Sequence, residues 1–117
     1  MSGSGPAPFS VSVDRTGPRV VVAARGELDL ATAPELETSL LPLLEAGDPV
    51  ALDLRELEFM DSTGLRVIVS ADGRARDEGR VLRLVRGPEA VQRIFRVTRL
   101  DERLEIGDDP DALAKSA

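Results

Sequence analysis

The hydrophobic pattern changes its period near the middle of the chain. Over residues 50–54, VALDL, apolar side chains alternate as in a β-strand, and over residues 65–69, LRVIV, they recur as on one face of a helix. A six-residue loop, residues 55–60, and then the block DSTG at residues 61–64 separate the two segments. The pattern therefore predicts a strand, a loop and a helix in succession. It places Ser62 where the first backbone N–H groups of the helix have no intrahelical partner.

Similar patterns on either side predict further strands and helices. Strands are expected over residues 9–13, 19–25, 50–54, 81–85 and 104–106, and helices between Thr32 and Gly47, between Gly64 and Gly79, after Pro88 and over residues 108–115. A turn at residues 16–18 makes the first two strands a hairpin, whereas a strand, a helix and a strand in succession join parallel neighbours. We therefore expect an α/β domain with a mixed sheet of four or five strands and about four helices, mainly packed on one face.

Three features concern the ends and the continuity of the predicted helices. Residues 32–35, TAPE, match a capping box, in which the threonine hydroxyl and the glutamate carboxylate each accept a hydrogen bond from the other residue's backbone N–H. Pro42 removes a helix hydrogen bond, so it is expected to kink or loosen the last turns. Residues 72–73, DG, interrupt the apolar stripe of the next helix. A break there stays open as an alternative to a continuous helix that stops at Gly79.

Length and composition indicate one globular domain. The 117 residues are too few for two domains of ordinary size, and 42% hydrophobic with 31% charged residues is an ordinary balance for a folded chain. Residues 1–8, MSGSGPAP, are small and have no apolar face, so their burial cannot compensate for the entropy lost on ordering. We therefore expect a disordered segment over residues 1–8 and a single domain over residues 9–117.

Charge and missing residue types argue against several functions. A net charge of −6 with a pI near 4.7 argues against nucleic acid as a partner, because binding a phosphate backbone needs clustered positive charge. Without Cys or His the chain lacks a thiol nucleophile and the commonest general base and zinc ligand, so we expect no enzyme, no metal and no cofactor. The longest aliphatic run, residues 20–24, is far shorter than the roughly 20 residues that cross a bilayer. We therefore expect a cytoplasmic protein without a membrane partner.

Two interpretations of Ser62 follow from its place at the start of a helix. In the first, Asp61 or Ser62 caps the helix, which is what these residue types do at most helix starts and which contributes roughly 1 kcal/mol. In the second, Ser62 is a phosphoacceptor, because a hydroxyl at an exposed helix start is reachable by a kinase and its phosphate would meet the positive pole of the helix. The two interpretations are compatible.

Four sequence blocks, in a fixed order, resemble one known family. They are GELD at residues 26–29, TAPE at residues 32–35, LDL at residues 52–54 and FMDSTGL at residues 59–65. On these blocks and their spacing the chain resembles the STAS domain family (sulfate transporter and anti-sigma factor antagonist), in its bacterial anti-sigma factor antagonist branch. The resemblance covers most of the chain and implies a single STAS-like domain. Arg99 stands where the family often has a glycine that ends the third helix.

The family resemblance implies a phosphorylation switch at Ser62. An anti-sigma factor that is itself a serine kinase would be bound and sequestered while Ser62 is unmodified, and released once it has phosphorylated Ser62. A PP2C-type phosphatase would reverse the modification, and the cycle would regulate sigma-factor-dependent transcription. ATP and its magnesium would reside on the kinase. The residues that the resemblance assigns to the partner-binding face are Asp29, Thr32, Asp61, Ser62, Thr63 and Gly64.

Other interpretations remain open, both for single residues and for the whole chain. In the simplest one, Asp29 and Glu27 are solvated or capping carboxylates at the end of a strand. A metal or acid–base site formed by Asp29 and Asp61 would lack further ligands and a poised base, so it is not expected. For the whole chain, the alternative is a constitutive STAS adaptor subunit of a transporter or signalling assembly, in which the DSTG block is only a capped helix start. A nucleotide-binding module would need a Gly-rich phosphate loop, which the sequence lacks.

Overall fold

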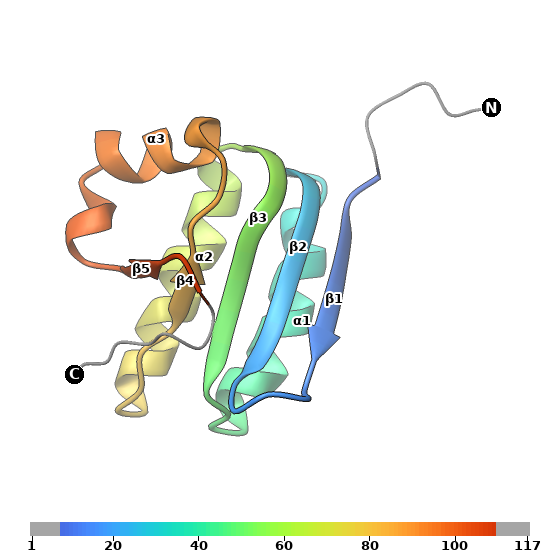
Figure 1. Cartoon of the computed structure of the whole chain (residues 1–117), viewed down its shortest axis with the longest axis vertical. Coiled ribbons are helices and arrows are strands. Elements are labelled where there is room, and N and C mark those ends of the chain that lie inside the picture. The colour runs from blue at the N-terminus through green and yellow to red at the C-terminus, as the bar shows by residue number, and fades with distance from the viewer. Residues whose placement is uncertain (1–7, 110–117) are drawn as a thin grey trace.

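A five-stranded sheet forms the centre of the molecule. The computed structural model describes residues 8–109 (Figure 1). The strands are β1 (Ser10–Asp14), β2 (Val20–Leu28), β3 (Val50–Met60), β4 (Arg83–Val85) and β5 (Glu105–Gly107), and they lie in this order across the sheet. β1 runs antiparallel to β2, whereas β2 to β5 run parallel to one another. The predicted α/β class and mixed sheet are therefore confirmed.

Three α-helices connect the parallel strands. α1 (Ala33–Glu45) joins β2 to β3, and α2 (Ser62–Asp77) joins β3 to β4. α3 (Glu89–Val97) and the 3-10 turn η1 (Leu100–Glu102) join β4 to β5. α1 and α2 pack side by side behind the same face of the sheet, whereas α3 lies at the end of the sheet where β3 finishes (Figure 1).

Two predictions fall partly outside residues 8–109. Of the helix predicted over residues 108–115, residues 108 and 109 are not helical and the others lie outside the described residues. The segment predicted to be disordered lies outside them as well, except for Pro8. In the part of the chain that the structure describes, no helix has the length and apolar character needed to cross a membrane.

An aliphatic core fills the space between the sheet and the two helices. Val22 of β2 and Leu52 and Leu54 of β3 are fully buried there. The stripe predicted for α1 is buried as well, and it consists of Leu36, Leu40, Leu43 and Leu44. Burying each large aliphatic side chain contributes about 1.5–3 kcal/mol. This packing holds α1 and α2 on the sheet and so fixes where both helices begin.

β3 is longer than the sequence pattern predicted. It continues past residue 54 to Met60, so the prediction of a loop over residues 55–60 was wrong. The backbone of this segment pairs with the end of β2, from Glu56 opposite Arg25 to Met60 opposite Leu28. Most of its side chains are exposed, which breaks the alternating pattern that marks a half-buried strand. The extension is held by backbone pairing, which the side-chain pattern does not record.

The start of α1 differs from the predicted capping box. Thr32 is the N-cap residue, but its side chain makes no capping hydrogen bond. Its hydroxyl donates instead to the carbonyl oxygen of Glu27 at 2.7 Å, so the capping box was a wrong prediction. The tight turn out of β2 has already engaged the hydroxyl that the box would need. α1 continues through Pro42 to Glu45, and Gly47 follows its end with a φ of 82°, as predicted.

α2 is continuous through the two residues that interrupt its apolar stripe. Asp72 is only 5% exposed, and its Oδ2 accepts a hydrogen bond from the Nε of Arg76 at 2.8 Å. The pair lies one turn apart on the helix, so a carboxylate is tolerated in a buried position. The alternative of a break at residues 72–73 is therefore wrong. α2 ends before Gly79, whose φ is 75°, as predicted.

α3 is followed by an arginine, Arg99, at the position where the family often has a glycine. Arg99 follows the helix with a φ of 63°, in the left-handed region. A residue with a Cβ pays roughly 1–2 kcal/mol for this conformation. Val91 and Phe95 hold the helix itself against the core, and both are fully buried, as predicted.

Candidate functional site

The ends of β2 and β3 bring two turns together at one edge of the sheet. Leu28 lies opposite Met60 in the parallel register, so the next residues, Asp29 and Asp61, leave the sheet at the same edge. The backbone N–H of Asp61 donates to the carbonyl oxygen of Leu28 at 3.1 Å. The start of α2, with Ser62, is therefore joined directly to the turn that leads into α1.

Asp61 caps α2. Its backbone is extended, with φ −105° and ψ −173°, and its Oδ1 accepts hydrogen bonds from the N–H groups of Thr63 at 2.9 Å and Gly64 at 3.1 Å. The carboxylate also stabilises the helix through its charge, since it lies at the positive pole. Of the two capping residues that the sequence left open, the structure shows Asp61.

Ser62 is the first residue of α2 and is exposed. Among the hydrogen bonds made within residues 8–109, none involves its hydroxyl, because the cap is already provided by Asp61. The serine hydroxyl therefore faces solvent at the positive pole of a helix, and no hydrogen bond within the described residues holds it. An oxygen in this position is accessible to an enzyme that modifies it.

The next two residues of the block differ in exposure. Thr63 is half-buried, whereas Gly64 is buried against the end of β2. A Cβ on Gly64 would lie 2.6 Å from the Cγ of Leu28, which is too close for any side chain. Gly64 therefore allows the close approach of α2 to β2, and through it the position of Ser62 is set.

Asp29 and Thr32 form a closed turn between β2 and α1. The Oδ1 of Asp29 accepts hydrogen bonds from the N–H groups of Ala31 at 3.0 Å and Thr32 at 3.2 Å. The Thr32 hydroxyl accepts one from the N–H of Asp29 at 2.9 Å and donates to Glu27. Both side chains are half-buried and stabilise the turn itself. The structure thus favours the capping interpretation of Asp29, and Glu27 enters the turn through its carbonyl oxygen.

The carboxylates at this edge are engaged by the backbone of their own turns. Asp29 and Asp61 each direct Oδ1 at backbone N–H groups of their own turns. Within residues 8–109 no three or more acidic side chains lie close enough together to hold a metal ion. Glu56, a third acid near the end of β3, pairs with Arg25 across the sheet at 3.6 Å.

Two exposed apolar side chains flank the site, and the sequence interpretation missed both. Leu30, in the turn after Asp29, is 74% exposed, and Phe59, two residues before Asp61, is 47% exposed. Large apolar side chains beside an accessible polar group are typical of a protein-binding surface. The available signal was the same for both, because the sequence pattern places Leu30 and Phe59 outside the predicted strands and helices.

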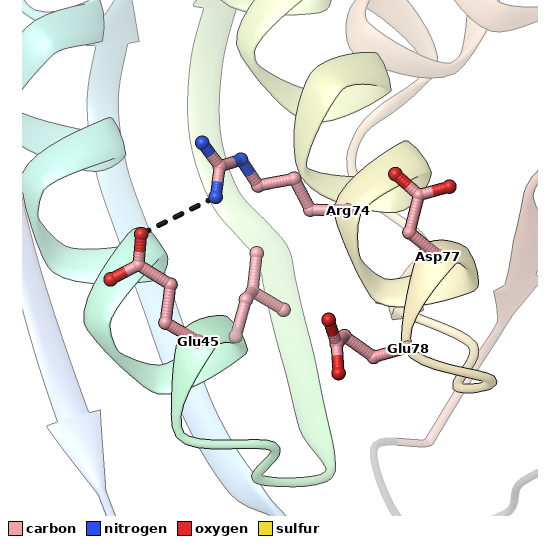
Figure 2. Close-up of a pocket in the computed structure, with 5 residues that line it drawn as sticks. Glu45, Arg74, Asp77 and Glu78 are labelled. Atoms are coloured by element: carbon pink, nitrogen blue, oxygen red, sulfur yellow. Dashed lines mark hydrogen bonds and ion pairs between the residues drawn. The ribbon is translucent and has the colours of Figure 1, made fainter.

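A hollow in the surface lies elsewhere on the molecule. It has a volume of about 280 Å³ and lies between the carboxyl-terminal ends of α1 and α2 (Figure 2). Its lining consists of Leu44, Glu45, Arg74, Asp77 and Glu78. Arg74 crosses it to pair with Glu45 at 3.3 Å. Because Ser62 begins α2 and this hollow lies at its other end, the two are separate features.

Comparisons with known proteins agree with the fold. A family model described as "Mlab, STAS domain" matches residues 11–107. The anti-sigma-B factor antagonist of Bacillus subtilis (strain 168) is 33% identical over 98 residues, which cover 84% of this chain and 90% of that protein. The crystal structure of an anti-sigma factor antagonist from Mycobacterium paratuberculosis has a TM-score of 0.81 with 27% identity, and the match covers 92% of each chain.

A more distant structure shares the fold alone. The Bacillus cell fate determinant SpoIIAA, solved in its phosphorylated form, has a TM-score of 0.69 at 16% identity. The match covers 89% of this chain and 96% of that one. It shows that the same arrangement of sheet and helices persists when few residues are shared.

Proposed function

The chain belongs to the STAS domain family, and on this premise we propose that it is a cytoplasmic anti-sigma factor antagonist controlled by phosphorylation of Ser62. With Ser62 unmodified, it binds and sequesters an anti-sigma factor that is itself a serine kinase. Phosphorylation by that kinase releases the kinase to hold its sigma factor, and a PP2C-type phosphatase restores the binding form. The partner supplies ATP and magnesium, while this chain contributes the acceptor hydroxyl and the docking surface.

The observation that carries the proposal is that Asp61 caps α2 while the hydroxyl of the next residue, Ser62, faces solvent. A phosphate on that hydroxyl lies at the positive pole of the helix, where backbone N–H groups favour an anion. Phosphorylation therefore leaves the folded chain intact, and its effect falls on binding. The similar proteins support the class of partner, since they are named as anti-sigma factor antagonists.

The change in affinity follows from charge. Phosphorylation adds about −1.5 to −2 charges to an edge of the sheet that already carries Asp29 and Asp61. A partner that covers this edge would have to remove the phosphate from water and approach the added negative charge, and both are costly. In this proposal Ser62 and Thr63 touch the partner, whereas Thr32 and Gly64 shape the face from within.

The acceptor can be identified directly. The protein is incubated with its cognate kinase and ATP, and the phosphate is mapped by mass spectrometry. We expect phosphate on Ser62 alone. Phosphate found only on Thr63 or Thr32 would refute the assignment. Thr63 is the most direct competitor, because it is the next hydroxyl-bearing residue of the same helix.

Substitution at Ser62 separates the switch from its main rival, a constitutive STAS adaptor. We expect Ser62→Asp to abolish binding of the anti-sigma factor with almost unchanged melting, and Ser62→Ala to bind whether or not kinase and ATP are present. Ser70→Asp adds the same charge at an exposed position two turns further along α2, so it should bind like the wild type. If Ser62→Asp binds as tightly as Ser70→Asp, the adaptor interpretation is correct.

A further inference from the structure

Arg66 is the arginine nearest in sequence to Ser62 on α2, and it differs from the other arginines of the helix. Arg74 pairs with Glu45 and Arg76 pairs with the buried Asp72. Arg66 is exposed, and it takes part in no hydrogen bond or ion pair within residues 8–109. In the part of the chain that the structure describes, its guanidinium is therefore a positive charge without an acidic partner.

The position of Arg66 places this charge beside the serine. Ser62 and Arg66 are four residues apart on one continuous helix, so their side chains lie on the same face one turn apart. A side chain on a helix covers the turn before its own Cα, and Arg66 is long enough to reach the first residue of α2. The Oδ1 atoms of Asp61 and Asp29 are bound by backbone N–H groups of their own turns, and within residues 8–109 neither acid forms an ion pair with Arg66.

Resting on the proposed function, we infer that a phosphate on Ser62 is bound by the guanidinium of Arg66, in an ion pair within the first two turns of α2. The fork of N–H groups on arginine matches phosphate oxygens, and an i, i+4 pair needs no change of the helix. Modification then does two things at once: it adds negative charge to the docking face and withdraws from a partner the positive charge that the unmodified form presents.

The inference is tested on protein that carries phosphoserine at position 62, installed by genetic encoding so that no kinase is needed. The second pKa of the phosphate is measured by ³¹P NMR titration in the otherwise wild-type chain and in Arg66→Gln. Pairing with a cation favours the dianion, so we expect the pKa to be higher in Arg66→Gln by about 0.3, the size of a helix-surface ion pair. In Arg66→Lys the phosphate pKa should return most of the way to the wild-type value. High salt should reduce the difference between the wild type and Arg66→Gln.

Arg74→Gln is the matched control, since it removes the same charge from the same helix at the far end. Asp29, Asp61 and the exposed Glu58 act on the phosphate equally in all these variants, so they do not contribute to the difference. Equal pKa values in Arg66→Gln and in the wild type, or an equal rise in Arg74→Gln, would overturn the inference. Far-UV circular dichroism checks that each variant is folded, which is expected because Arg66 is exposed and has no partner within residues 8–109.

This test and the test of the proposed function fail independently. If the kinase does not modify Ser62, the proposed switch is wrong, but the phosphoserine protein still reports whether Arg66 binds phosphate. If Arg66→Gln has no effect on the pKa while Ser62 is phosphorylated by the kinase, the switch stands and only the role of Arg66 is withdrawn.

Discussion

Gly64, in the first turn of α2, lies so close to Leu28 at the end of β2 that a Cβ on the glycine would be 2.6 Å from the leucine Cγ and 3.1 Å from its carbonyl oxygen. The same carbonyl accepts the hydrogen bond from the N–H of Asp61. The GELD and DSTG blocks, more than thirty residues apart in sequence, are therefore in direct contact. This contact places Ser62 at the edge of the sheet.

We expect Gly64→Ala to destabilise the fold by about 1–3 kcal/mol, the usual cost of overpacking a close contact. The added methyl group must displace either the Leu28 side chain or the start of α2. Urea denaturation followed by circular dichroism measures the loss.

Gly73→Ala is the matched control for this prediction, because it makes the same change in the same helix where nothing lies within 4 Å of the new Cβ. Alanine is the better helix former by about 0.5–1 kcal/mol, so we expect stabilisation there. Two variants that shift stability in the same direction would contradict the contact between Gly64 and Leu28.

Asp61→Ala should cost about 1 kcal/mol, because two N–H groups at the start of α2 lose their acceptor. Ser62→Ala should leave stability nearly unchanged, since the hydroxyl makes no hydrogen bond within the described residues. The midpoints of urea unfolding for the two variants give the comparison. A larger loss for Ser62→Ala would mean that the serine, and not the aspartate, caps the helix.

Leu30→Ser and Phe59→Ser should each weaken the complex with the anti-sigma factor by about tenfold, a loss typical of an interface anchor. Neither change should reduce stability much, because the two side chains are 74% and 47% exposed in the free protein. Isothermal titration calorimetry measures the affinity. Val81→Ser is the control: Val81 is 44% exposed in the loop between α2 and β4, at the opposite end of α2 (Figure 1). Equal affinities for all three variants would remove Leu30 and Phe59 from the docking face.

Ionised Asp53 contributes to the stability of the fold, and this contribution is lost in acid. Burial raises the pKa of this carboxyl, but hydrogen bonds from the guanidinium and backbone N–H of Arg55, with the charges of Arg55 and Arg25, hold the pKa below its ordinary 3.8. A pKa that is lower in the folded than in the unfolded chain stabilises the fold above the unfolded value. That contribution disappears as the pH falls through the folded value.

Arg55→Gln should therefore raise the pKa of Asp53, as measured by NMR titration of the carboxyl group. The variant should be less stable than the wild type at neutral pH, and the difference should vanish in acid once Asp53 is protonated. Arg96→Gln, which breaks the exposed pair with Glu89, should leave the pKa of Asp53 unchanged. An unaltered Asp53 pKa in Arg55→Gln would show that burial and Arg25 alone set it.

The candidate site was accessible to sequence analysis only as far as its residues are local. A serine after an aspartate at the start of a helical period marks a helix start, so Ser62 could be singled out and both capping residues named. The choice between them depended on a backbone angle at Asp61. Leu30 and Phe59 were not predicted as site residues, because the exposure of a side chain is a property of the folded surface. From sequence alone, a large apolar residue is usually assigned to the core.

The sequence by itself determined the order and type of the elements, because periods of two and of three to four residues are written in the side chains along each segment. The tertiary structure decided what depends on hydrogen-bond partners and burial, which these periods do not encode. It extended β3 through residues 55–60 by pairing their backbone with β2, and it engaged the Thr32 hydroxyl with Glu27 in place of a capping box. It also kept α2 whole by pairing the buried Asp72 with Arg76. In each case a hydrogen-bond partner or the packing around a residue settled the outcome, and neither is contained in the local pattern.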